Sequence, residues 1–95
     1  MTYRLKFLES AEREWRKLDS NTQLQFKKKL IERLEQPRFP SAKLRESKDR
    51  YKIKLRSSGY RLVYEVRDAE IIVLVVAVGR RDRDQVYLAA AKRSG

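Results

Sequence analysis

The stretch from Tyr51 to Arg67, YKIKLRSSGYRLVYEVR, limits the possible folds more than any other part of the chain. Apolar and charged residues alternate on either side of Ser58-Gly59, and a period of two is typical of half-buried strands. Glycine accepts the positive φ that tight hairpin turns require. We therefore predict two antiparallel strands with a turn centred on Ser58-Gly59. Their shared apolar face is formed by Tyr51, Ile53, Leu55, Tyr60, Leu62, Tyr64 and Val66.

A turn at this place also sets the expected pairing, because side chains that share a face must meet across the two strands. The predicted pairs are Leu55 with Leu62, Ile53 with Tyr64, Lys54 with Val63, Lys52 with Glu65, and Arg56 with Arg61. The opposite face then collects four cations, Lys52, Lys54, Arg56 and Arg61. Like charges this close repel one another unless an anion binds among them, so this face is the first candidate for a binding site.

The charge of the chain favours a polyanionic partner. Its 95 residues are expected to form one domain, residues 1–95, and they carry 24 Lys and Arg against 13 Asp and Glu, a formal net charge of +11. A field of this strength favours nucleic acid, although a basic protein without such a partner can have the same composition.

Several kinds of site are excluded because the chain contains no Cys and no His. Disulfides, thiolate metal sites, the usual zinc ligand and the usual general base are all missing, so no metal or cofactor is expected. The longest apolar run, Ile71–Val78, is too short to cross a membrane, and no signal peptide opens the chain. A cytoplasmic location without membrane contact is the default expectation.

The remaining patterns predict an α+β fold in which a strand and two helices precede the hairpin, and a strand and a helix follow it. The predicted elements are a strand at Thr2–Phe7, helices at Ser10–Leu18 and Ser20–Glu35, a central strand at Ile71–Val78, and a helix from Asp82 to about Lys92. Ser10 and a capping box of Ser20 with Gln23 are expected to open the first two helices, Asp82 with Gln85 to open the last, and Gly79 to end the strand. The central strand is apolar on both faces, and the apolar stripe predicted for the last helix, Val86, Ala89 and Ala90, consists mostly of alanine. An exposed strip with Ile72 and Leu74 is therefore expected.

Five side chains are candidates for chemistry, because the last strand and helix bring two further groups to the cationic face. They are Lys52, Lys54, Arg61, Arg81 and Tyr87. Such a set can cleave RNA: the 2′-hydroxyl is an internal nucleophile, so the protein need only align it, hold the phosphate charge and move two protons. A lysine crowded by cations has a lowered pKa and can act as base or acid, and tyrosine can stack on a base. The candidates for phosphate contact outside this set are Lys27, Lys28, Lys29 and Arg56.

Each candidate also has a purely structural alternative. Lys52 can pair with Glu65, Arg81 can pair with Asp84, and Tyr87 can serve as half-buried packing. Lys54 and Arg61 can be surface cations of an edge strand. The basic run in the second helix can be a solvated face.

The motifs that contain these residues resemble a known family. KLRSSGYRLVYEV and VGRRDRDQVY, with EWRKL and FKKKL earlier in the chain, resemble the RelE family of bacterial toxins over essentially the whole length. The resemblance implies a compact microbial-ribonuclease-like fold with a hairpin-rich antiparallel sheet. It also implies an endonuclease that cuts mRNA in the ribosomal A site and is neutralised by a RelB-like antitoxin.

The family's functional positions fall on the same five residues. The resemblance makes Lys54 the candidate general base and lets Arg81 assist the leaving 5′-oxygen. Lys52 and Arg61 would hold phosphate charge, and Tyr87 would stack on or orient the nucleotide. Which of Lys52, Lys54 and Tyr87 moves the proton stays open. The antitoxin is expected to dock beside the last helix and the exposed strip with an acidic, amphipathic segment.

Two other functions fit parts of the sequence. A non-catalytic module that binds RNA or the ribosome would block translation by occupancy alone. A DNA-binding repressor fits less well, because no helix carries an evident set of base-reading residues.

Overall fold

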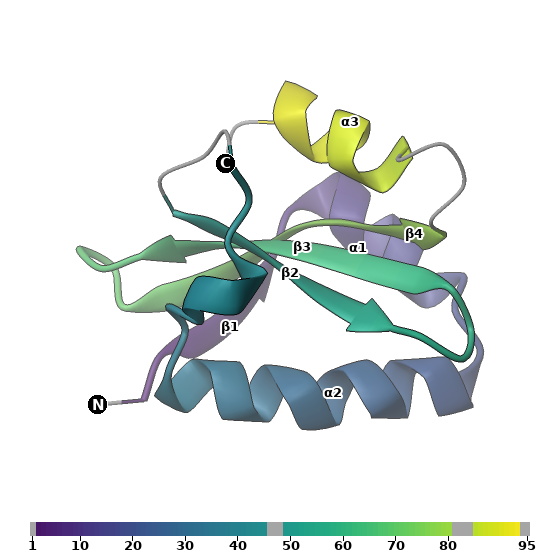
Figure 1. Cartoon of the computed structure of the whole chain (residues 1–95), viewed down its shortest axis with the longest axis horizontal. Coiled ribbons are helices and arrows are strands. Elements are labelled where there is room, and N and C mark those ends of the chain that lie inside the picture. The colour runs from purple at the N-terminus through teal and green to yellow at the C-terminus, as the bar shows by residue number, and fades with distance from the viewer. Residues whose placement is uncertain (1, 46–48, 81–84, 94–95) are drawn as a thin grey trace.

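The computed structural model describes residues 2–45, 49–80 and 85–93. Four strands form one sheet, and helices lie on both of its faces (Figure 1). The elements are β1 (Arg4–Phe7), α1 (Glu9–Arg16), α2 (Ser20–Glu35), the 3-10 turn η1 (Pro40–Ala42), β2 (Arg50–Leu55), β3 (Tyr60–Arg67), β4 (Ile72–Arg80) and α3 (Gln85–Lys92). None of these helices is long and apolar enough to cross a membrane.

The strand order is β1-β4-β3-β2, which confirms the predicted α+β class. The β2–β3 and β3–β4 pairs are antiparallel, whereas β1 pairs with β4 in parallel, so the sheet is mixed. Figure 1 shows α2 along one face of the sheet and α3 over the other. The strand predicted to be central, β4, is indeed an inner strand, and residues 72–78 are all buried.

The boundaries of β4 differ from the prediction at both ends. Ile71 lies outside the strand with a φ of 55°, the left-handed conformation, in the turn that joins β3 to β4. Gly79 does not end the strand, because β3 is long enough to pair Gly79 with Arg61 and Arg80 with Tyr60. At the other edge of the sheet, β1 begins two residues later than predicted, at Arg4.

The pairing of the hairpin is shifted by two residues from the predicted one. Tyr51 pairs and stacks with Tyr64, with their ring centroids 5.6 Å apart. The turn occupies four residues, 56–59, and Gly59 takes a φ of 78° at its end while its N–H donates to the carbonyl of Leu55 at 2.9 Å. A shift of two leaves every side chain on its predicted face, since the side-chain period is also two. The faces were therefore predicted correctly and the individual pairs were wrong.

The main core lies between the sheet and the first two helices. Phe26 and Leu30 of α2 are fully buried there, and Trp15 of α1 packs between Phe7 and Phe26 with centroid distances of 5.4 and 6.1 Å. Burial of this apolar surface is what fixes α2 on the sheet, at roughly 25 cal/mol per Å².

A smaller core lies on the other face. Val63 and Ala77 of the sheet pack there against Val86 and Ala90, which confirms the apolar stripe predicted for the last helix. The start predicted for this helix, at Asp82, lies outside the described residues.

The predicted exposed strip is absent, because Ile72 and Leu74 are only 3% and 5% exposed. Each lies on β4 between two long charged side chains of its neighbour strands: Arg4 and Arg67 flank Ile72, and Lys6 and Glu65 flank Leu74. The aliphatic stems of such side chains cover apolar surface while their charged ends reach water. Coverage of this strip therefore comes from side chains of the neighbouring strands and does not require a helix.

The first two helices begin differently from the prediction. Asp19, not Ser20, caps α2, and its carboxylate accepts a hydrogen bond from the backbone N–H of Thr22 at 3.2 Å. Ser20 is already the first helical residue. The first helix begins at Glu9 after Leu8, with no side-chain cap, so Ser10 does not cap it.

Candidate active site

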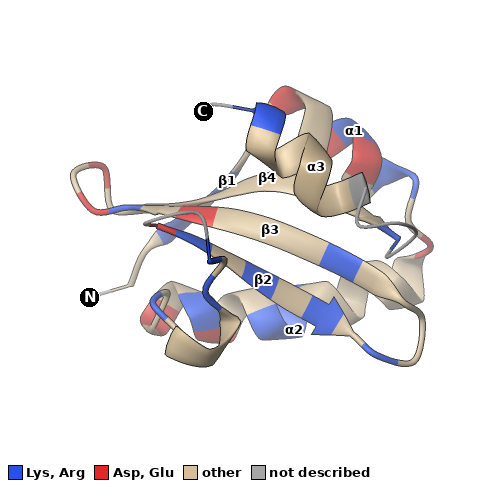
Figure 2. Ribbon diagram, turned by 45° about the horizontal axis from the view of Figure 1, so that its top comes forward, with Lys and Arg blue, Asp and Glu red and all other residues tan. Residues whose placement is uncertain are grey.

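The hairpin places three of the predicted catalytic side chains on one face. Lys54 of β2 lies directly opposite Arg61 of β3, and Lys52 lies two positions away on the same strand, opposite Val63. Figure 2 shows the Lys and Arg segments of β2 and β3 side by side. Arg56 lies in the turn and is exposed, so its predicted pairing with Arg61 is wrong.

Arg61 is buried, with only 7% of its surface exposed. Within the described part of the chain its side chain forms one hydrogen bond, a long one of 3.4 Å from Nη1 to the carbonyl of Tyr60, and has no carboxylate partner. The alternative that Arg61 is a surface cation is therefore wrong. Burying a charge is costly unless an anion compensates it, and arginine is rarely buried without one.

Lys54 is exposed, and its pKa is lowered from the ordinary value of a lysine. Repulsion from the ammonium group of Lys52 is the largest cause, followed by partial desolvation and then by the charge of Arg61. A lowered pKa increases the fraction of neutral amine near physiological pH, which is the form that accepts a proton.

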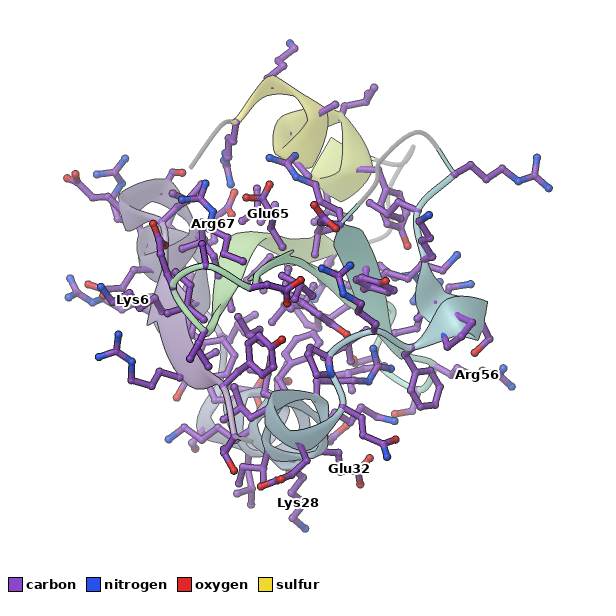
Figure 3. The ribbon with its side chains drawn as sticks, turned by 90° about the vertical axis from the view of Figure 1, so that its left-hand side faces the viewer. Lys6, Lys28, Glu32, Arg56, Glu65 and Arg67 are labelled. Carbon is purple, nitrogen blue, oxygen red and sulfur yellow. The ribbon has the colours of Figure 1, made fainter. Side chains whose placement is uncertain are left out.

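The acidic residue on this face is already engaged by other side chains. Glu65 accepts hydrogen bonds from Arg50 at 3.0 Å and from Arg67 at 2.7 Å, and Figure 3 shows Glu65 and Arg67 together beneath α3. Burial would raise the pKa of Glu65, but the two guanidinium groups outweigh it and hold the pKa below its usual value. Glu65 lies opposite Arg50 and not opposite Lys52, so the predicted alternative of a Lys52–Glu65 cross-strand pair is wrong.

Tyr87 comes to this face on α3. It is half-buried and packs against the cluster that contains Val63, the residue opposite Lys52. Tyr87 therefore contributes to packing, as the structural alternative predicted. Arg81, with Asp84, lies outside the described residues, so its predicted role and its structural alternative both stay predictions.

Two arginines that were not among the predicted site residues hold α3 in place. Arg50 donates to the backbone carbonyls of Ala90 and Arg93 at the end of the helix. Arg93 in turn donates to both carboxylate oxygens of Glu14 in α1, at 2.9 and 3.1 Å, and to the carbonyl of Val76 at 2.9 Å. Arg50 continues the alternation of Lys52 and Lys54, so the period of two would have found it. No local signal marks Glu14 or Arg93.

The three lysines of the basic run in α2 do not all line the same surface. Lys27, Lys28 and Lys29 are all exposed, and Figure 3 shows Lys28 pointing away from the sheet. Lys29 instead lines an open groove beside β2, about 360 Å³ in volume, to which Lys54 and Arg56 also contribute.

Comparison with known proteins agrees with this geometry. Residues 5–85 match the model of the ParE toxin of the type II toxin–antitoxin system parDE. The chain is 57% identical to the mRNA interferase toxin RelE of Escherichia coli K12 over 98% of both chains, and equally similar to the mRNA interferase RelE of Shigella flexneri.

Solved structures extend the comparison. The fold matches the structure of a double arginine-to-alanine variant of the E. coli toxin RelE in the free state, with a TM-score of 0.91, 55% identity and 98% coverage of both chains. It matches the same toxin in complex with a peptide of the antitoxin RelB with a TM-score of 0.83, 54% identity and full coverage. The chain therefore belongs to the ParE toxin family of type II toxin–antitoxin systems and, within it, to the RelE-type toxins.

Proposed function

We propose that this chain is a ribosome-dependent endoribonuclease that cuts mRNA in the ribosomal A site and so inhibits translation. The observation that carries the proposal is the pair of Arg61 and Lys54, a buried guanidinium without a described carboxylate partner directly opposite an amine with a lowered pKa. An RNA phosphate between them would supply the missing anion. The names of the close relatives, mRNA interferases, support the same reaction.

The reaction proposed is a transesterification within the RNA. The 2′-oxygen attacks the neighbouring phosphorus, the bond to the 5′-oxygen breaks, and a 2′,3′-cyclic phosphate and a 5′-hydroxyl are left. Lys54 is the best candidate to accept the 2′-hydroxyl proton, and Arg81 the best candidate to assist the leaving oxygen. Arg61 and Lys52 would stabilise the charge that develops on the phosphate. Lys52 and Tyr87 remain the other candidates for the proton transfer.

The ribosome has to supply what this site lacks. No side chain here is an ordinary strong base, and a flexible RNA is rarely aligned for in-line attack. Alignment alone can account for roughly 7–11 kcal/mol of a barrier. The basic residues of α2, together with Arg56, are proposed to contact RNA phosphates of this large partner. Action on ribosomes also implies a cytoplasmic location.

The test compares naked mRNA with ribosomes carrying the same mRNA, at equal protein concentration and under single-turnover conditions. We expect cleavage only on ribosomes and only within the A-site codon. Arg61→Met should lower the rate by about 100-fold or more, the usual cost of removing one donor to a developing oxyanion, while ribosome binding changes little. Lys6→Met removes an exposed cation from β1 and should leave the rate unchanged.

Two results would contradict the proposal. Equal cutting of naked mRNA would show that the ribosome is not needed. Stalled ribosomes with intact mRNA would identify the chain as a non-catalytic blocker of translation.

We further propose that a RelB-like antitoxin docks at α3. Leu88 on this helix is 59% exposed, and a hollow of about 450 Å³ beside it is lined by Leu88, Ala89, Lys92 and Arg93. Apolar and basic groups together suit an acidic, amphipathic segment. Because Ile72 and Leu74 are already buried, docking would act by shifting the helix that carries Tyr87 or by placing carboxylates near Arg81.

Hydrogen exchange with and without the antitoxin tests this placement. We expect the change in protection at residues 72–80 and 85–92. Protection confined to α1 and α2 would show that the antitoxin binds elsewhere.

A further inference from the structure

A second cationic surface lies around the outer edge of β2 and adjoins the face that carries Arg61. It is the open groove of about 360 Å³ between β2, the second half of α2 and η1. The groove residues used below are Lys29, Arg33, Phe39, Lys52, Lys54 and Arg56. Figure 3 shows Arg56 on the side of the molecule opposite Lys6.

The charge of this groove is not compensated within the protein. Five of its lining residues are cationic, and no ion pair to a carboxylate is formed by any of the five within the ranges that the structure describes. Such a concentration of one sign of charge in a concave surface attracts anions.

The groove also contains a stacking surface with a fixed geometry. The guanidinium of Arg33 lies 4.4 Å from the centre of the Phe39 ring, and 43% of Phe39 is exposed. Arg33 is held there because Nη1 donates to the Tyr64 hydroxyl at 2.9 Å, and that hydroxyl donates to the carbonyl of Pro37 at 2.7 Å. Aromatic rings and arginine planes are the surfaces on which unpaired RNA bases stack.

The edge of β2 adds backbone groups that can read a base. The carbonyl of Arg50 accepts a hydrogen bond from Leu44 on the outer side of the strand. By the alternation of a strand, the peptide groups of Lys52 and Lys54 face the same way. Arg33 already donates to the carbonyl of Lys52, at 3.4 Å, which leaves the N–H and C=O of Lys54 at the groove.

We propose that this groove binds one unpaired RNA nucleotide outside the cleavage site, with its base on Phe39 and its phosphate beside Lys29 and Arg56. The inference rests on the proposed function, because Lys52 and Lys54 belong to both surfaces. An RNA strand on the catalytic face reaches the groove by crossing the edge of β2. The fixed stacking surface distinguishes an RNA ligand from an acidic peptide, which needs charge alone.

Direct binding tests the groove without requiring cleavage. The probe is a fluorescein-labelled single-stranded RNA hexanucleotide, and anisotropy gives the Kd for the full chain. We expect Phe39→Ala and Lys29→Glu each to raise the Kd at least about fivefold, the lower end of the cost of losing one base stack.

Two control variants distinguish binding in the groove from a general effect of net charge or of losing an exposed apolar side chain. Ile31→Ala removes another exposed apolar side chain of the same region, and Lys6→Glu makes the same charge change at the other edge of the sheet. Both should bind RNA like the parent chain. If Phe39→Ala behaves like Ile31→Ala, the assignment to RNA is overturned. It is also overturned if a glutamate-rich decapeptide binds more tightly than the RNA and loses its binding with Lys29→Glu.

Ribosomes then identify the source of the nucleotide. Phe39→Ala is compared with the parent chain on ribosomes whose mRNA either ends at the A-site codon or extends beyond it. A rise in KM only on extended mRNA assigns the nucleotide to mRNA, and the same rise on both assigns it to ribosomal RNA. No change on either, with the parent chain active, refutes the subsite while leaving the proposed function intact. If the parent chain does not cut mRNA on ribosomes, the proposed function is refuted. The binding assay then still shows whether the groove binds RNA.

Discussion

Replacing Glu14 by alanine should destabilise this protein far more than an ordinary exposed salt bridge would suggest. β1 pairs with β4 only as far as Phe7 and Val75, so among the described residues no strand lies beside the rest of that edge of β4. Glu14 accepts the N–H of Val78 there at 3.0 Å. Arg93 completes the edge by donating to the carbonyl of Val76. Two side chains thus take the place of a missing strand.

The magnitude follows from what Glu14→Ala leaves behind. The N–H of the buried Val78 would have no acceptor, which costs about 1–3 kcal/mol. The bidentate pair with Arg93 is partly exposed, 31% for Glu14 and 23% for Arg93, and adds at most about 1 kcal/mol. We expect a loss of about 2–3 kcal/mol in the free energy of unfolding, which lowers Tm by roughly 10–20 °C in a chain of this size.

Urea unfolding and thermal unfolding measure the loss, and hydrogen exchange at the Val78 amide locates it. Glu12→Ala is the matched control, because Glu12 forms an exposed ion pair with Arg16 one turn away on the same helix. That substitution should cost no more than about 0.5 kcal/mol. Glu14→Gln keeps an acceptor for the amide and should fall between the two. If Glu14→Ala and Glu12→Ala cost the same, side chains do not complete the edge of β4 and the reasoning is refuted.

Three further outcomes are expected. Lys52→Ala removes the largest cause of the lowered Lys54 pKa, so the pKa of Lys54 should rise. The increase of the single-turnover rate with pH should then move to higher pH. An unchanged pH profile would exclude Lys54 as the base. Arg61→Met removes a buried charge without a described partner, so the free energy of unfolding should stay the same or rise by about 1–4 kcal/mol although cleavage is lost; a clear loss of stability in urea would indicate an anionic partner within the protein. Ile71→Gly removes a β-branched side chain from a left-handed backbone conformation and so relieves its strain. The free energy of unfolding should rise by about 1 kcal/mol, measured against Ala69→Gly in the same turn. A lower free energy of unfolding for Ile71→Gly would show that this conformation carries no strain.

The faces of the sheet could be predicted from sequence, but the pairs across it could not. Alternation from Tyr51 to Arg67 fixed which side chains share a face, and the face is what brings Lys52, Lys54 and Arg61 together. The exact pairing depended on the length of the turn. Both a two-residue and a four-residue turn accept a glycine at position 59, and both preserve the faces.

Burial was harder to predict where the covering groups come from distant parts of the chain. Ile72 and Leu74 are covered by long charged side chains of neighbouring strands, including β1, whose parallel pairing with β4 had no signal in either segment. The arginines that hold α3 were missed for the same reason, since their acceptors are backbone carbonyls far away in sequence. The alanine stripe of α3 was predicted because its pattern is local.

The parallel pairing of β1 with β4 has a consequence for how the protein is made. Of the four described strands, β1 leaves the ribosome before the others, whereas its partner β4 is synthesised after them, so β1 stays unpaired until β4 has been synthesised. Contacts of such wide sequence separation form slowly. A nascent chain that ends before Ile72 therefore lacks both β4, which joins β1 to the hairpin, and the helix that carries Tyr87. On the proposed function, an unfinished toxin cannot attack the ribosome that is translating it.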